Sequence, residues 1–224
     1  MYVPRYNLET DVATLHGLIR AHPLGTWVTV GPEGPVANHV PVVLDPEPGP
    51  FGTLRCHFAR ANPAWRILAD GGPVLVVFQG AEAYVTPSWY ASKAEHGRVV
   101  PTWAYAVVHA RGTARVVEDA RWLRRHVAEM TDAFERPRPE PWAVSDAPEA
   151  YVDRLVRAIV GVELEVETLQ GKWKAAQERS DADRSGVASG LTTEGAAGMA
   201  REVERAGASE RTRAPERGHA SRRT

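Results

Sequence analysis

The chain has 224 residues, 43% of them hydrophobic and 25% charged, which excludes a disordered protein and predicts one main folded domain. A formal net charge of −1 gives no overall positive field and argues against nucleic acid as a partner. Cys56 is the only cysteine, which excludes an internal disulfide and any cysteine-based metal cluster and favours a reducing compartment.

The order of the predicted elements follows from hydrophobic periodicity and from turn residues. The expected strands cover residues 26–30, 36–44, 53–59, 74–79, 103–117 and 162–169. The expected helices run from a cap at Asn7 through Ile19, from Asn62-Pro63 to Leu68, from a cap at Asp119 through Met130, from 145–148 to Ile159, and from Asp181 to Leu191.

Six strands interspersed with single helices, rather than a regular strand-helix alternation, favour an α+β protein built on an antiparallel barrel with flanking helices. We assign residues 1–191 to this domain. Residues 192–224 consist mainly of Ala, Gly, Arg and Glu, with almost no large apolar side chain. Because such a segment cannot bury enough apolar surface to offset its ordering entropy, we expect a disordered tail there.

The most informative stretch is YVTPSWYASKAEHGRVVPTWAYAVVH, residues 84–109, which places three Tyr, two Trp and two His between two strand-like runs. A plain core strand would repeat Val, Ile and Leu instead. Aromatic faces, hydroxyls and a few cationic groups at strand ends are typical of a site for a planar cofactor. Aromatic residues at strand spacing are also common in ordinary cores, so both interpretations stay open at this stage.

A second candidate lies in the strand over residues 53–59. Alternation places Leu54, Cys56 and Phe58 on one face and Thr53, Arg55 and His57 on the other. A neutral imidazole is the commonest axial ligand of haem iron, and a neighbouring guanidinium suits a propionate. The alternative is a hydrogen-bonded histidine near a barrel mouth beside an arginine in a surface ion pair.

Four segments occur in the order found in a known family: RCHFARANPAW (residues 55–65), the stretch over residues 84–109, PWAVSDAP (residues 141–148) and GKWKAAQ (residues 171–177). Together they resemble the PaiB family, described as FMN-binding negative transcriptional regulators. The resemblance spans residues 1 to about 191 and implies a six-stranded split barrel of the FMN-binding type. It also implies a homodimer with cofactor sites at the subunit interface.

One branch that looks like PaiB, the piperazate synthases, binds haem b and closes the N–N bond of L-piperazate from N5-hydroxy-L-ornithine, a small amino-acid substrate. The usual PaiB pattern has PTWNY, GKWKLSQN and LRGH. This chain has Ala104, Ala175-Ala176-Gln177-Glu178 and Cys56 at corresponding places. An amide, a hydroxyl and another amide are thus replaced by groups that cannot make the same hydrogen bonds or by a negative charge, so we expect haem b rather than FMN.

On this hypothesis His57 is the axial ligand, and Lys93 or Arg60 binds the substrate carboxylate. The residues expected to hold the cofactor are Arg55, His57, Ser88, Trp89, Trp103, Tyr105 and Lys172. The alternative is an FMN-binding transcriptional regulator, in which Arg55 holds the FMN phosphate with help from Arg60, Lys93, Ser88 or Lys172. No helix-turn-helix is evident, and the stripe Arg121, Arg124 and Arg125 is typical of a solvated helix face.

The N-terminal segment MYVPRYNLETD has no apolar signal core. No apolar run approaches the roughly 18 residues that a membrane-spanning helix needs. We therefore expect a cytoplasmic protein that does not contact a membrane.

Overall fold

A computed structural model describes residues 1–47 and 49–213 of the chain. These residues form two compact units, each described here by itself. Unit 1 comprises Met1 with residues 9–80 and 107–171. Unit 2 comprises residues 2–8 and 81–106 together with the described residues from Lys172 onward.

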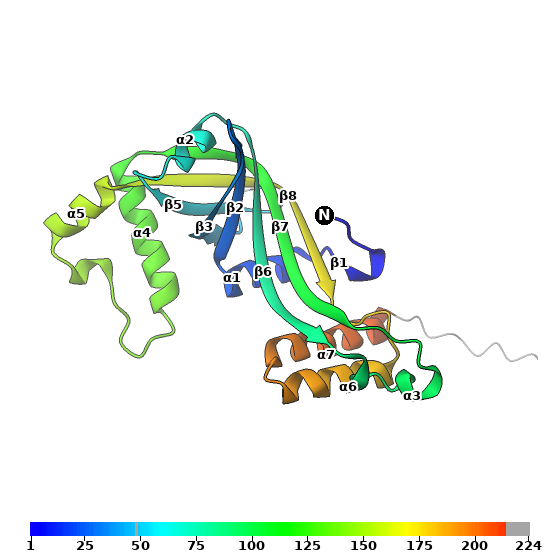
Figure 1. Ribbon diagram of the computed structural model, residues 1–224. Coiled ribbons are helices and arrows are strands. Elements are labelled where there is room, and N and C mark those ends of the chain that lie inside the picture. The colour runs from blue at the N-terminus through cyan, green and yellow to red at the C-terminus, as the bar shows by residue number, and fades with distance from the viewer. Residues whose placement is uncertain (48, 214–224) are drawn as a thin grey trace, which may run out of the picture. The chain divides into compact units, whose positions relative to one another are not determined.

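The strands form one sheet of eight members among the described residues (Figure 1). They are β1 (Leu8–Glu9), β2 (Leu24–Gly31), β3 (Gly34–Pro41), β4 (Val43–Asp45), β5 (Thr53–Ala59), β6 (Pro73–Val85), β7 (Thr102–Val117) and β8 (Ile159–Lys174). The order is β3-β2-β6-β7-β8-β5-β4, with β1 paired to β8. The pairs β2–β3, β2–β6, β4–β5 and β5–β8 are antiparallel.

The α+β class is confirmed, but the predicted number of six strands is not. The predicted strand over residues 36–44 is interrupted at Val42, whose amide donates to the carbonyl of Pro23 at 2.9 Å, so β3 and β4 are separate. The two-residue β1 adds the eighth strand. Because β3 and β4 lie at opposite ends of the sheet order yet are separated by one residue in the chain, the sheet must curl until its edges approach each other.

The five predicted helices are present with shifted boundaries. The helices are α1 (Val12–Ala21), α2 (Ala64–Ala69), α3 (Ser92–His96), α4 (Ala120–Glu135), α5 (Glu149–Arg157), α6 (Asp181–Thr193) and α7 (Ala197–Arg213), with short 3-10 turns at Arg5–Asn7, Pro87–Trp89 and Val144–Asp146. Of these, α3 and α7 were not predicted. Asn7 was the wrong cap for α1: its backbone is part of a 3-10 turn, and Asp11 accepts the amide hydrogen of Thr14 at 2.9 Å. Asp119 caps α4 as predicted, accepting from the Trp122 amide at 2.7 Å.

The core of unit 1 is the concave interior of the curled sheet. Trp27 from β2 and Phe58 from β5 meet edge to face, with ring centroids 6.1 Å apart. Phe78 from β6 and Leu164 from β8 are completely buried in unit 1. Cys56 is buried and has a free thiol, as its inward-facing position on β5 predicts.

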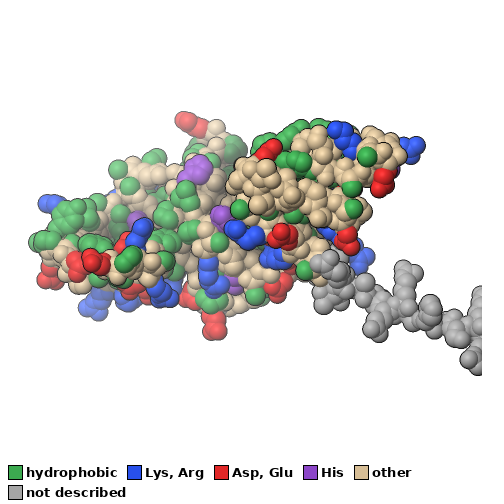
Figure 2. Space-filling model, turned by 90° about the horizontal axis from the view of Figure 1, so that it is seen from below, with side chains coloured by type: hydrophobic (Ala, Val, Ile, Leu, Met, Phe, Trp, Pro, Cys, Tyr) green, Lys and Arg blue, Asp and Glu red, His purple; other side chains and the backbone are tan. Residues whose placement is uncertain are grey.

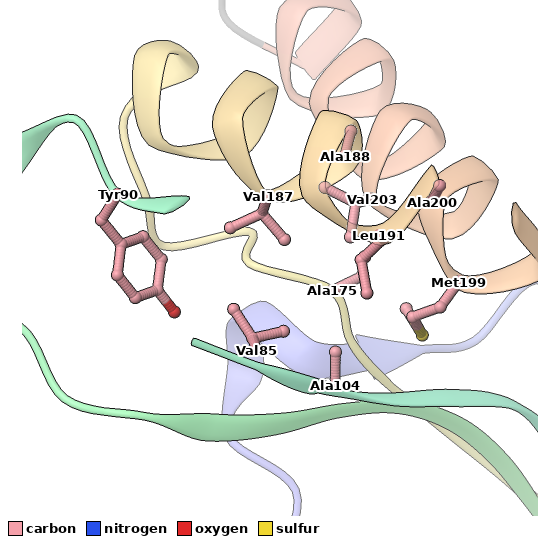
Figure 3. Packing of buried hydrophobic residues seen from close by; sticks show 10 residues of the cluster. All are labelled: Val85, Tyr90, Ala104, Ala175, Val187, Ala188, Leu191, Met199, Ala200 and Val203. Atoms are coloured by element: carbon pink, nitrogen blue, oxygen red, sulfur yellow. The ribbon is translucent and has the colours of Figure 1, made fainter. Parts of the chain in front are cut away.

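The core of unit 2 is made by α6, α7 and the strand ends (Figure 3). Ala104 and Ala175 lie in it beside Val187, Leu191 and Met199. Helix α7 begins at Ala197 and is described through Arg213, so the predicted disorder does not apply from residue 197 to 213, and residues 214–224 lie outside the described residues. Sequence composition misled here because small side chains let α6 and α7 approach closely, and few large residues are then needed to bury the contact.

Candidate functional site

Strand β5 directs Arg55 and His57 to the same face, as the alternation predicts. Leu54, Cys56 and Phe58 are buried, whereas Arg55 and His57 are partly exposed. The strand pairs with β8 so that His57 is opposite Gly161 and Arg55 is opposite Glu163. The pairing of β5 with β8 therefore fixes the position of the His57 side chain on the sheet.

Helix α4 contributes a residue that the sequence interpretation missed, His126. Its Nε2 lies 3.2 Å from Nδ1 of His57, and the two ring centroids are 5.3 Å apart with planes at 77°. His126 is only 1% exposed. A signal for this residue was present, because His126 follows Leu123 by three residues and Trp122 by four, on the buried face of the helix.

Trp122 holds His126 in place. The two rings stack at 17° with centroids 4.9 Å apart, and the indole Nε1 donates to Glu163 at 3.0 Å. A Cβ atom at Gly161 would lie 2.3 Å from the Trp122 ring, so only glycine leaves room for the indole on β8. Gly161, Trp122, His126 and His57 thus form a continuous contact series, which we call the histidine layer. Figure 1 shows α4 at the end of unit 1 where β5 and β8 pair.

Replacing Gly161 by alanine is expected to displace Trp122 and lower the free energy of unfolding by about 1–3 kcal/mol, the usual effect of overpacking. Chemical denaturation of both proteins measures the difference. Gly72→Ala is the control, since an added Cβ there meets no atom within 4 Å and should change stability by less than about 0.5 kcal/mol. Equal stability of the Gly161→Ala variant and the parent chain would refute the proposed packing.

Both histidines of the layer are neutral at physiological pH. Burial lowers the pKa of His57, and burial together with nearby His57 and Arg55 lowers the pKa of His126 to about 3. A neutral imidazole has one nitrogen with a free lone pair, the form that ligates metals. The environment of His57 therefore meets the electronic requirement for an axial ligand.

Arg55 is engaged by acidic side chains of unit 1. Its guanidinium lies 3.4 Å from Asp45 and 3.2 Å from Glu129. This arrangement matches the alternative in which Arg55 takes part in an ion pair. Two carboxylates already compensate its charge, which weakens the case for Arg55 as the partner of a propionate.

Arg60 is held by backbone and acidic groups at the end of β5. It donates to the carbonyls of Arg157 and Ile159 at 3.1 and 3.2 Å, and it pairs with Glu118 at 2.5 Å. These bonds join β5 to the start of β8. Arg60 therefore stabilises the fold. Of the two residues predicted to bind the substrate carboxylate, Lys93 has fewer competing contacts.

In unit 2, Ser88 and Lys93 lie together, whereas Trp89 is used in packing. The ammonium group of Lys93 donates to the Ser88 hydroxyl at 3.2 Å, and Lys93 is exposed. The Trp89 ring lies over α6, where a Cβ at Gly190 would come within 2.3 Å of it. Trp89 therefore follows the core interpretation that aromatic residues at strand spacing allow.

The aromatic face of unit 2 consists of Tyr84, Trp103 and Tyr105 together with Tyr2 and Lys172. The Tyr84 and Trp103 rings meet with centroids 6.1 Å apart, and Lys172 Nζ lies 5.2 Å from the Tyr105 centroid and 5.9 Å from that of Tyr2. Trp103 is 50% exposed, and its indole nitrogen donates to Glu82. Three predicted cofactor residues, Trp103, Tyr105 and Lys172, thus belong to one face.

The substitutions at Ala104 and Ala175 lie away from the aromatic face. Both alanines are buried in the core of unit 2, because alternation turns Trp103 and Tyr105 outward and Ala104 inward. Gln177 binds the local backbone, accepting from the Ala175 amide at 2.8 Å and donating to the Trp173 carbonyl at 2.7 Å. For Ala104, the position where the related pattern has an amide, the argument for haem therefore loses its force, and the choice of cofactor depends on His57.

Within residues 1–47 and 49–213, no group of three or more His, Cys, Asp or Glu side chains is arranged to hold a metal ion. The same part of the chain contains no helix with the length and apolar character needed to cross a membrane.

Comparison with known proteins places the chain in a family. Residues 1–168 match the family model described as "Putative FMN-binding domain". An uncharacterized protein of Aspergillus fumigatus is 35% identical over 91% of this chain and 97% of its own length. The Bacillus subtilis "Protease synthase and sporulation protein PAI 2" is 30% identical over 87% of this chain and 90% of its own length.

Among solved structures, the FAD and heme binding protein from Mycobacterium smegmatis superposes with a TM-score of 0.53. It is 18% identical, and the match covers 75% of this chain and 73% of that chain. This likeness concerns the fold. The chain therefore belongs to the FMN-binding domain family that includes PaiB, and its resemblance to PaiB is confirmed.

Proposed function

We propose that the protein binds haem b and that His57 supplies the axial nitrogen. The observation that carries this proposal is the His57–His126 contact of 3.2 Å, which occupies Nδ1 of His57 and leaves Nε2 as the nitrogen available to a ligand. A metal-bound imidazole typically has its other nitrogen held by a hydrogen-bonding partner in this way. The lowered pKa of His57, caused by burial, supports the same assignment.

Within unit 2, Trp103 and Tyr105 stay the sequence-based candidates for flat contacts with a cofactor, and Lys172 stays the candidate for binding a cofactor carboxylate. Trp103 exposes half of its surface, and the ammonium group of Lys172 lies above the Tyr105 ring. Aromatic faces pack against a planar macrocycle, and an exposed ammonium attracts a carboxylate. Arg55 is a weaker choice because Asp45 and Glu129 already surround it.

The proposed reaction is the dehydrative ring closure of N5-hydroxy-L-ornithine to L-piperazate, as in the piperazate synthases that the sequence resembles. One N–N bond forms and one N–O bond breaks. The hydroxyl leaves with a proton as water, and there is no net redox change. Bound haem would supply a Lewis-acidic iron for a weak N–O bond. The chain's part is to orient the two nitrogens. Lys93, which is exposed in unit 2, stays the sequence-based candidate for binding the substrate carboxylate.

An absorption spectrum of the purified protein, before and after addition of hemin, tests the cofactor. We expect a Soret band that persists through gel filtration. Incubation of the haem-loaded protein with N5-hydroxy-L-ornithine should then yield L-piperazate by mass spectrometry. A stable Soret band without product would support haem binding but contradict the proposed reaction. The absence of any Soret band would contradict haem binding itself.

The second candidate is an FMN-binding regulator of the PaiB type, supported by the family description and by the Ser88–Lys93 pair. A hydroxyl and an ammonium 3.2 Å apart suit the FMN phosphate. On this alternative the protein takes up FMN with a flavin spectrum, and Lys93→Ala weakens FMN binding while leaving riboflavin binding unchanged. The predicted arginine stripe gives little support for contact with nucleic acid, because Arg124 pairs with Asp153.

We also propose that the protein is a homodimer. Apolar side chains are exposed on α4, α5 and the loop between them, where Figure 2 shows hydrophobic atoms gathered at one end of unit 1. They are Phe134, Trp142, Tyr151 and Leu155, which are 39–48% exposed. Exposed apolar groups of this kind often mark an interface between proteins. Light scattering should give twice the chain mass, and Leu155→Asp should shift the mass towards the monomer; Val30→Asp, at another exposed apolar position, is the control.

A further inference from the structure

The position of His126 behind His57 points to a task beyond packing. Its Nε2 faces Nδ1 of His57 at 3.2 Å, and the rings meet edge to face. His57 therefore has one nitrogen committed inside the protein and one left for a ligand. Nδ1 of His57 can either donate or accept the hydrogen bond with His126. If Nδ1 carries the hydrogen, Nε2 of His57 has a free lone pair; if Nδ1 accepts, Nε2 carries the hydrogen.

Trp122 and His57 restrain the His126 ring, Trp122 on one face and His57 at the edge. Trp122 stacks on the ring, and the Trp122 indole is itself fixed by its bond to Glu163 at 3.0 Å. His126 is almost completely buried, and its second nitrogen, Nδ1, has no protein hydrogen-bond partner among the described residues. The ring can therefore serve His57 only through Nε2.

This burial is unfavourable for stability by itself. A buried polar atom without a partner costs about 1–3 kcal/mol, a penalty that an apolar side chain at position 126 avoids. A leucine would also pack against Trp122. The imidazole at this place is therefore better explained by what its Nε2 does for His57 than by its contribution to the core.

We propose that His126 is a positioning residue that accepts the Nδ1–H hydrogen of His57 and so holds His57 with a free lone pair on Nε2. The opposite arrangement, in which His126 Nε2–H donates, places the hydrogen of His57 on Nε2 and blocks it as a ligand. Accepting the hydrogen also fixes the ring orientation and makes Nε2 more basic. The application to haem rests on the proposed function, whereas the hydrogen position is a property of the haem-free protein.

Nitrogen NMR on haem-free protein labelled with 15N-histidine tests the hydrogen position directly. The chain has eight histidines, and His57→Ala identifies the resonances of His57. At neutral pH, the parent chain should show the Nδ1–H form of His57. His126→Leu should mix the two forms, whereas His126→Gln, whose amide oxygen can accept the same hydrogen, should retain Nδ1–H.

Haem titration supplies a second readout. His126→Leu should weaken hemin binding about 10–100-fold and raise the reduction potential of the bound iron, while His126→Gln stays near the parent on both measures. Unfolding curves at neutral pH should show the leucine variant at least as stable as the parent, so lost binding is not lost folding. A parent chain with hydrogen on Nε2 of His57, or a leucine variant with unchanged tautomer, overturns the inference. Failure of all variants to bind hemin overturns the proposed cofactor but leaves the tautomer result standing.

Discussion

Replacing His57 with alanine should abolish haem retention. The substitution removes the proposed iron ligand and cannot be compensated by His126, which lies behind His57 and is buried against Trp122. The loss of affinity should exceed the roughly 10–100-fold effect of removing an outer-shell partner. The Soret absorbance that remains after gel filtration measures it, and added imidazole should restore part of the band by entering the space left by the side chain.

His96→Ala is the matched control. His96 is an exposed histidine at the end of α3, and its Nδ1 accepts only the local amide of Arg98 at 3.0 Å. This variant should bind hemin as the parent does. A His57→Ala protein that keeps a full Soret band would rule out His57 as the axial ligand and transfer the question to the aromatic face of unit 2.

Acid should destabilise the haem-free protein through His126. The pKa of His126 is lowered to about 3 in the folded chain, by burial and by the nearby His57 and Arg55, against about 6.5 in an unfolded chain. Below pH 6.5 the imidazole of His126 therefore binds a proton in the unfolded state but stays neutral in the folded state. The stabilising contribution is complete above pH 6.5 and is lost as the pH falls towards 3. The lowered pKa of His57 acts in the same direction.

Denaturation at pH 7, 6, 5 and 4.5 measures this effect. Between pH 6 and 4.5 the free energy of unfolding of the parent should fall, relative to His126→Gln, by on the order of 1 kcal/mol per pH unit. His96→Gln, which removes an exposed histidine, should follow the parent. Parallel pH profiles for the parent and His126→Gln would show that His126 is not a buried neutral group.

The sequence predicted several local features well. The bounds of β5 are those expected, and its alternation correctly placed Arg55 and His57 on one face. Asp119 caps α4, and Val162, Leu164 and Val166 are buried on β8 between partly or fully exposed glutamates. Each of these follows from a period of two or from a cap within a few residues.

Other features of the candidate site were out of reach of such patterns. His126 and His57 are 69 residues apart in the sequence, and nothing in the periodicity of either segment names the other as its neighbour. Ala104 was interpreted as a cofactor-site substitution because the related PaiB pattern has an amide at this place, yet it points into the core of unit 2. Arg60 looked like a free cation until its three hydrogen bonds were known.

The sequence alone therefore determined the α+β class, the family resemblance and the side of β5 from which His57 emerges. These properties depend on the alternation of side chains along one strand and on motifs in a fixed order, which are local. Only the tertiary structure decided which groups surround that imidazole. Gly161 makes room for Trp122, Trp122 orients His126, and His126 occupies one nitrogen of His57. Such a series depends on close packing between distant segments, where a single Cβ atom changes what fits.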